Sequence, residues 1–206
     1  MAVDDLVGAV LVAGLVLFLV GAGAWRPTYD RPFPETLSAI RRDRSRWRWI
    51  HVWMIVAMLT TPAGFAATVV VLDRPTARAL ALMGAVVYAL GAVCWIASLT
   101  FRLTVVPWAA EVAATTGSPP PSATALDRWA TWLYAVHMCG AYVASAVLAI
   151  AVLTEPVGPS WLGWAGIVWG LSFLLGFLTP RVAVAFRPPF WAHAYTGAVG
   201  VALLVT

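Results

Sequence analysis

Three histidines carry most of the chemistry that this sequence could perform: His51, His137 and His193. Each lies in a long apolar stretch, where an imidazole can ligate a haem iron or anchor a helix at the membrane interface. His51 and His193 share one local pattern, aromatic-x-His-x-aromatic, in residues 49–53 and 191–195. Because Trp, Tyr and His all favour the interface, anchoring alone is enough to explain this pattern.

Small residues lie beside two of the histidines at helical spacing. The small residues that share a face with His137 or His193, or lie next to it, are Ala130, Gly140, Ala141, Ala144, Thr196, Gly197 and Gly200. Such a face serves close helix packing, its commoner use in membranes, or leaves room for a planar macrocycle ligated through the imidazole. The sequence leaves both readings open.

A haem with two histidine ligands requires imidazoles that approach one iron from opposite faces. His51 and His193 each lie about one helical turn inside the same interface, whereas His137 lies about two turns in. The predicted axial pair is therefore His51 with His193, and His137 lines the pocket or substitutes as a ligand. Interfacial arginines would pair with the haem propionates, the candidates being Arg48, Arg102 and Arg187.

A helix-breaking signal, Thr60-Thr61-Pro62, lies within the apolar stretch 49–72. Pro62 cannot donate a backbone hydrogen bond and displaces the carbonyl of Met58. Pro62 falls on the helix face of His51, so the signal indicates a kink beside a cavity near that histidine. Threonine hydroxyls can equally heal such a break with no functional consequence.

Several other kinds of chemistry are missing from the sequence. It contains no lysine, which excludes Schiff-base and P-loop chemistry, and no asparagine or glutamine. No Asp or Glu lies deep in an apolar stretch, so a carboxylate proton relay or a carboxylate metal site at mid-depth is not expected. No Ser-His-Asp set is present, and the cysteines, Cys94 and Cys139, lie in apolar stretches as buried thiols. Whether the chain is an enzyme stays open.

The elements that must position these residues are membrane-spanning helices. The composition, 62% hydrophobic and 11% charged, is far from that of a soluble domain. Apolar stretches long enough to cross the bilayer occupy residues 5–25, 49–72, 79–101, 129–154, 161–180 and 189–206. We therefore predict an all-α, polytopic bundle of six transmembrane helices that forms a single membrane domain over residues 1–206.

Arginines predict the orientation of this bundle. Eleven of the thirteen arginines lie in the connectors 26–48, 102–128 and 181–188, and two, Arg74 and Arg78, lie on the opposite side. The positive-inside rule therefore places these connectors in the cytoplasm and both termini outside it. Arg102 is expected to snorkel to the cytoplasmic interface, and the proline-rich residues 118–122 are expected to form a flexible or polyproline loop.

The same residues suggest the cellular setting. The net charge of +4 comes from connector arginines, so it reflects topology and not a nucleic-acid partner. Arginine in place of every lysine, beside abundant Ala, Val, Gly and Pro, is typical of a high-GC bacterial genome. We therefore expect a multi-pass protein of the bacterial inner membrane, whose partners are the lipid bilayer and other membrane subunits.

Three functions remain after these exclusions. The first is a non-catalytic membrane subunit or accessory protein, which fits twelve tryptophans, glycine stripes and little polar chemistry. The second is a b-type haem protein of electron transfer. The third is a binder or carrier of an apolar, lipid-like small molecule in a cavity beside Pro62.

Overall fold

The computed structural model describes residues 2–23, 33–155 and 157–205, and every regular element in these ranges is helical. The helices are α1 (Val3–Ala22), α2 (Phe33–Arg42), α3 (Arg44–Ala67), the 3₁₀ turn η1 (Thr68–Val71), α4 (Pro75–Thr116), α5 (Pro121–Thr154), α6 (Trp161–Leu178), α7 (Ala183–Phe186) and α8 (Phe190–Val205). The predicted all-helical fold is confirmed.

Five helices are long and apolar enough to cross a membrane: α1, α3 with η1, α4, α5 and α6. This finding confirms a polytopic membrane protein. The sixth predicted span, 189–206, is represented by α8, which has 16 residues. At 1.5 Å per residue α8 is about 24 Å long, shorter than a hydrocarbon core of about 30 Å.

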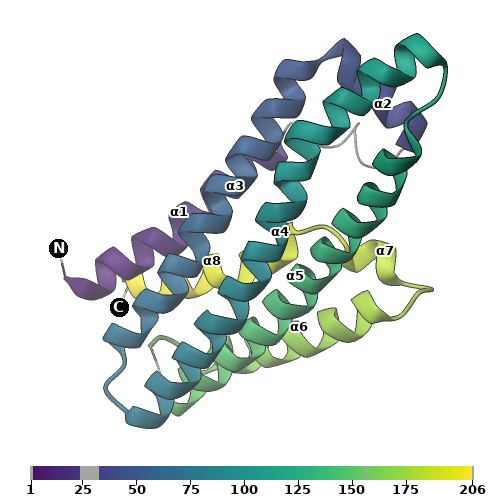
Figure 1. The fold of residues 1–206 in the computed structure, drawn as a ribbon. Helices are drawn as coiled ribbons and strands as arrows, with labels where there is room; N and C mark the ends of the chain where they lie inside the picture. Colours follow the sequence, from purple (N-terminus) through teal and green to yellow (C-terminus); the bar gives the residue numbers. More distant parts are fainter. Residues whose placement is uncertain (1, 24–32, 156, 206) are drawn as a thin grey trace.

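The long helices lie side by side in a bundle (Figure 1). Going around the bundle, α8 packs on α1, α1 on α3, α3 on α4, α4 on α5 and α5 on α6. Helix α8 also touches α3, α5 and α6, so it reaches toward the middle of the bundle from the side of α1. The start of α1 and the end of α8 therefore lie close together.

Glycines allow several of these helices to approach until their backbones touch. A Cβ added to Gly8 of α1 would lie 2.7 Å from the carbonyl oxygen of Gly200 in α8. A Cβ added to Gly170 of α6 would lie 2.6 Å from the carbonyl oxygen of Tyr142 in α5. Such contacts are the usual means of close packing in membranes, where the hydrophobic effect does not drive helices together.

The predicted connector 102–128 is mostly helical. Helix α4 continues to Thr116 and has 42 residues, or about 63 Å, twice the thickness of a hydrocarbon core. It ends at Gly117, whose φ of 82° is the left-handed cap conformation, and α5 begins at Pro121. The proline-rich sequence is therefore only a short turn between two helices.

The described part of the connector 26–48 is also helical, while its residues 26–32 lie outside the described residues. Asp43 begins α3, because its carboxylate accepts a hydrogen bond from the backbone N–H of Arg46 at 2.9 Å. Leu37 and Ile40 of α2 are buried in a second apolar cluster with residues of α4 such as Val106. Residues 33–48 and 102–128 thus form a helical extension of the bundle.

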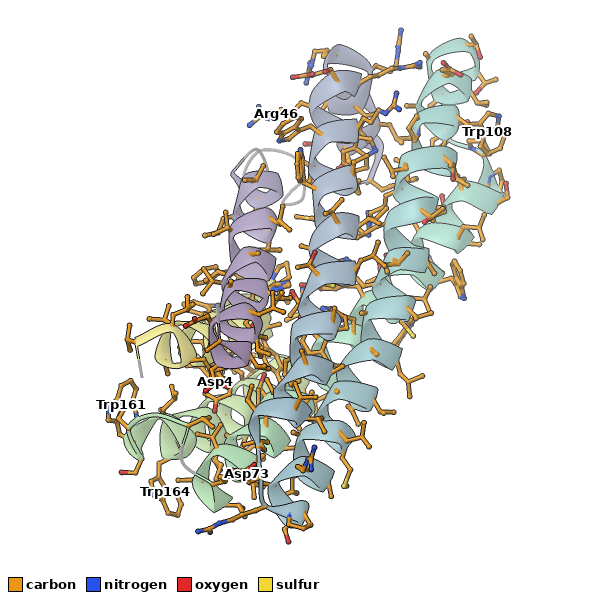
Figure 2. The ribbon with its side chains drawn as sticks, turned by 90° about the vertical axis from the view of Figure 1, so that its left-hand side faces the viewer. Asp4, Arg46, Asp73, Trp108, Trp161 and Trp164 are labelled. Atoms are coloured by element: carbon orange, nitrogen blue, oxygen red, sulfur yellow. The ribbon has the colours of Figure 1, made fainter. Side chains whose placement is uncertain are left out.

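This extension occupies one end of the molecule. Figure 2 shows Arg46 and Trp108 at that end, and Asp4, Asp73 and Trp161 toward the opposite end. In the extension, the guanidinium of Arg44 forms an exposed ion pair with Glu111, which joins α3 to α4. The bundle is therefore basic at one end and carries acidic residues at the other.

At the opposite end, Glu155 ties two inter-helix turns together. Its carboxylate accepts hydrogen bonds from the backbone N–H groups of Asp73 at 2.8 Å and Arg74 at 2.7 Å. The Arg74 guanidinium in turn donates to the carbonyl of Thr154 at 2.7 Å. These backbone hydrogen bonds favour the ionised carboxylate and lower the pKa of Glu155.

We predict that Glu155→Gln lowers the melting temperature of the detergent-solubilised protein at neutral pH. Because the folded-state pKa of Glu155 is lowered, its contribution is present at neutral pH and is lost as the pH falls through that pKa. Melting curves from neutral to acidic pH should therefore converge for the two proteins. Parallel curves with equal melting temperatures would contradict this role.

Candidate functional site

Six buried side chains from five helices form a connected cluster in the middle of the bundle. We call this cluster the histidine centre. Its members are Phe18 of α1, Thr61 of α3, Tyr88 and Trp95 of α4, His137 of α5 and His193 of α8. Trp95 is 3% exposed and the other five side chains are fully buried. Helices distant in sequence thus bring two of the three histidines into one polar cluster.

His193 is held by contacts from α1 and α3. Its Nδ1 lies 3.3 Å from the hydroxyl oxygen of Thr61, within hydrogen-bond distance. Its imidazole stacks on the ring of Phe18, with centroids 4.5 Å apart and planes 19° apart. Gly14 lets α1 come this close to α3, because a Cβ there would lie 2.5 Å from the Thr61 hydroxyl oxygen.

His137 is held by α4. Its imidazole stacks on Trp95 at 4.6 Å with an interplanar angle of 26°, and it meets the edge of Tyr88 at 5.8 Å and 89°. The α4 backbone passes close to it at Gly91, where an added Cβ would lie 3.5 Å from His137 Nδ1. The two imidazoles of the centre lie within Coulombic range of each other.

Phe18 and Trp95 join the two histidines on one side of the cluster, since their ring centroids are 6.5 Å apart. On the other side Tyr88 lies beside Thr61 and stacks on Phe65 at 4.8 Å. Two sets of contacts therefore link His193 to His137. One passes through the rings of Phe18 and Trp95, and the other passes through Thr61 and Tyr88.

Four polar atoms of the centre are buried without a hydrogen-bond partner in the described part of the chain. They are Tyr88 Oη, both ring nitrogens of His137 and Nε2 of His193. Buried polar atoms are nearly always paired in folded proteins, and each exception calls for an explanation such as bound water or a ligand. The histidine centre concentrates these exceptions in one place.

His51, the expected partner of His193, lies elsewhere. It is fully buried, and its Nδ1 donates to the carbonyl of Trp47 at 2.6 Å, with the indole of Trp47 against its ring. Thr61, which contacts His193, is ten residues further along α3, a rise of about 15 Å. The fold therefore places His193 in the same cluster as His137 and away from His51.

The three arginines predicted to meet haem propionates lie in different surroundings. The guanidinium of Arg102 lies 3.5 Å from the carboxylate of Asp127, and its backbone carbonyl accepts from the Trp47 indole at 2.8 Å. Arg48 is exposed on α3. Arg187 is exposed just before α8, and its carbonyl accepts from the hydroxyl of Tyr134, whose ring touches Trp95 at 5.5 Å.

The Thr60-Thr61-Pro62 sequence does not break α3, which continues past it to Ala67. Thr60 donates to the carbonyl of Val56 at 2.9 Å, and not to the carbonyl of Met58, which is the one that Pro62 leaves without a backbone donor. Thr61 faces His193 and not His51. Thr61 therefore lies at the histidine centre, ten residues along α3 from His51, where the sequence suggested a cavity.

The small residues beside the histidines serve helix packing. Gly197 and Gly200 of α8 contact α1, and an added Cβ would lie 2.5 Å from a methyl carbon of Leu15 or 2.8 Å from the carbonyl of Gly8, respectively. Gly140 faces the carbonyl of Val87 in α4 at 3.4 Å. Neighbouring helices therefore fill these glycine faces, which corresponds to the close-packing alternative, and large aromatic rings lie beside the two histidines.

The arrangement has a clear chemical character. The six members of the centre carry no carboxylate, and two imidazole Nε2 atoms are left without a partner. Neutral imidazole nitrogens can accept a hydrogen bond or ligate a metal. Sequence reasoning identified both histidines and Thr61, but it missed Phe18, Tyr88 and Trp95, because nothing in an apolar helix shows which residues will face a histidine on another helix.

Residues 6–205, nearly the whole chain, match the family model DUF4386, described as a domain of unknown function. No curated protein and no solved structure matches the chain.

We predict that Gly14→Ala destabilises the protein by displacing Thr61 from His193. Overpacking of this kind costs about 1–3 kcal/mol, and each kcal/mol corresponds to about 2–4 °C in melting temperature for a chain of this size. Gly140→Ala is the matched control, because its Cβ would meet only ordinary contacts of 3.4–3.9 Å. Equal melting temperatures for the two variants would show that the Gly14 contact is not needed.

Proposed function

This chain belongs to the DUF4386 family, and we propose that it is a multi-pass membrane protein that binds a small molecule at the histidine centre. The observation that supports this proposal is that Nε2 of His137 and Nε2 of His193 have no hydrogen-bond partner in the described part of the chain. Both side chains are fully buried.

Packing alone does not account for these atoms. A polar group left unpaired in a buried site costs about 1–3 kcal/mol relative to one that is satisfied. Apolar side chains of similar size would fill the same space without that cost, and the surrounding helices are rich in them. A bound molecule that forms hydrogen bonds or coordinate bonds with these atoms removes this free-energy cost. Ligand binding would therefore explain why polar residues occupy these positions.

The site favours a molecule with an apolar body and few charges. Its walls are the rings of Phe18, Trp95 and Phe65, and its polar atoms are neutral. The haem protein and the carrier of a lipid-like molecule, both considered from the sequence, share these requirements. The accessory subunit is the competing function. It is supported by α6, whose most apolar stretch is only 22% buried and which exposes Trp161 and Trp164 to lipid or to another subunit.

We further propose the membrane arrangement predicted from the sequence: six spans, both termini outside the cytoplasm, in a bacterial inner membrane. The separation of Arg46 from Asp4 and Asp73 at opposite ends supports this orientation (Figure 2). Helix α8 would be the sixth span, although it is short. Its glycine contacts with α1 hold it beside a helix of full length.

The test of ligand binding replaces His137 by leucine, which is apolar and similar in size. Wild-type protein purified in mild detergent is extracted with organic solvent, and the extract is analysed by mass spectrometry. We expect a compound that co-purifies with the wild type and is lost from His137→Leu. Ser145→Ala is the matched control, since this buried hydroxyl on the same helix donates only to the Ala141 carbonyl, at 2.8 Å.

The packing alternative gives the opposite result. If the histidine only fills space, the wild type carries no compound, and His137→Leu melts at the same temperature or higher, because it removes an unpaired polar group. That outcome would overturn the proposal and favour the accessory subunit.

The orientation is tested by two cysteine variants in a background lacking Cys94 and Cys139. Ser45 and Ser160 are both exposed and lie in the helical extension and beside α6, respectively. In intact cells an impermeant thiol reagent should label Ser160→Cys and not Ser45→Cys. The reverse pattern would place the termini in the cytoplasm. Thr206, the terminal position expected to lie outside, is beyond the described residues.

A further inference from the structure

The helical extension contains a pocket of its own, and we propose that this pocket binds a monocarboxylate with a compact apolar body. The pocket lies between α2 and the last turns of α4 and has a volume of about 250 Å³. Counted along α4 from Trp95 to Ala113, it is about 27 Å from the histidine centre. The pocket is therefore a separate site, and its ligand does not depend on a molecule bound at the histidine centre.

The pocket exists because α4 presents only small residues to α2 near its C-terminus. Ala110, Ala113, Ala114 and Gly117 line it, and their spacing of three or four residues places them on one face of the helix. A Cβ added to Gly117 would have no neighbouring atom within 4 Å. The side formed by α4 is therefore apolar and leaves open space.

Helix α2 supplies both apolar and polar groups on the opposite side. Leu37, Ser38 and Arg41 line the pocket. Leu37 is buried in the second apolar cluster, whereas Ser38 and Arg41 are exposed. Because Ser38 and Arg41 are three residues apart, their side chains are neighbours on the surface of α2. A hydroxyl and a guanidinium therefore lie together at the side of the pocket that is open to solvent.

The guanidinium of Arg41 selects an anion. Within the described ranges of the chain it has no ion-pair or hydrogen-bond partner, and none of the residues that line the pocket is acidic. Glu111, which follows Ala110, is already paired with Arg44. The planar guanidinium matches a carboxylate with two parallel hydrogen bonds, and the Ser38 hydroxyl can donate a third.

The helix ends favour an anion with one negative charge. Helices α2 and α4 both end beside the pocket, at Arg42 and Thr116, so the partial negative charges of two C-termini lie near it. The start of α5 offsets them little, because residues 119–121 are prolines, which have no backbone N–H. A phosphate dianion would be repelled by these ends, whereas one lining guanidinium neutralises a monocarboxylate.

The volume of the pocket limits the apolar part of the ligand. An apolar cavity of about 150 Å³ is large enough to hold benzene. A pocket of about 250 Å³ therefore has room for one ring or a short alkyl chain together with a carboxylate. Long-chain fatty acids are too large to enter it.

The experiment uses phenylacetate and hexanoate as probes, which carry one carboxylate on a ring or on a short chain. Each is titrated into the purified full chain in detergent, and binding is followed by saturation-transfer NMR with empty micelles as the blank. We expect saturable binding of both probes. Phenylacetamide, which has the same shape and no charge, should bind about tenfold more weakly or less, and phenyl phosphate should also bind more weakly than phenylacetate.

Two pairs of variants locate the site. Arg41→Gln should weaken phenylacetate binding by about tenfold or more, whereas Arg42→Gln, which removes the same charge from the adjacent residue outside the pocket, should leave it nearly unchanged at physiological salt. Ala114→Leu should abolish binding because the larger side chain fills the pocket. Thr115→Leu is its matched control, since Thr115 is exposed and does not line the pocket. Melting temperatures close to that of the wild type verify that all four variants fold.

Several outcomes would overturn the inference. Equal losses in Arg41→Gln and Arg42→Gln would show only the general charge of this end of the molecule. Unchanged binding in Ala114→Leu would place the probe elsewhere, and phenylacetamide or phenyl phosphate that binds as tightly as phenylacetate would contradict the ligand class. Absence of saturable binding of both probes would refute the site. None of these results bears on the compound sought with His137→Leu, because that variant leaves the pocket unaltered.

Discussion

Backbone contact at glycines is the constraint on which this bundle depends. The contact of Gly8 with Gly200 fixes α8 against α1, and that of Gly14 with Thr61 fixes α1 against α3. Together they set the depth at which the short α8 enters the bundle, and so they bring His193 beside Thr61. In a membrane such close approach supplies the van der Waals packing that burial from water cannot.

The histidine centre shows how a membrane bundle can hold polar groups without charge. The helices satisfy their own backbone groups, so only side chains bring polar atoms into the interior. Thr61, Tyr88, His137 and His193 are all neutral donors and acceptors, and aromatic rings surround them. In the described part of the chain, four of the six buried side-chain polar atoms without a hydrogen-bond partner lie at this centre, and the other two are the hydroxyls of Ser98 and Tyr195.

The positions of most helices can be predicted from local sequence patterns, whereas the contacts between helices cannot. Apolar length predicted where the helices lie, because hydrocarbon thickness imposes a minimum on each span. The continuation of α4 past Arg102 was missed because arginine, threonine and proline suggested a connector, whereas packing against α2 and α5 keeps these residues helical. The sequence-based prediction paired His51 with His193 because it estimated the depth of each histidine by counting residues along its own helix. Such a count does not include the tilt and offset with which α8 meets α3. Which rings face a histidine depends on contacts between helices, and no local pattern encodes these contacts.

The length of α4 has a mechanical consequence. The helix that presents Tyr88 and Trp95 to the histidine centre runs on as one element to Thr116 in the extension. From Trp95 to that tip the distance is about 32 Å at 1.5 Å per residue. Pivoting this rod by about 10° at Trp95 would carry the tip through about 5 Å, a displacement comparable to one helical turn. Helix α4 therefore passes the histidine centre near its own midpoint and connects it to the basic surface of the molecule.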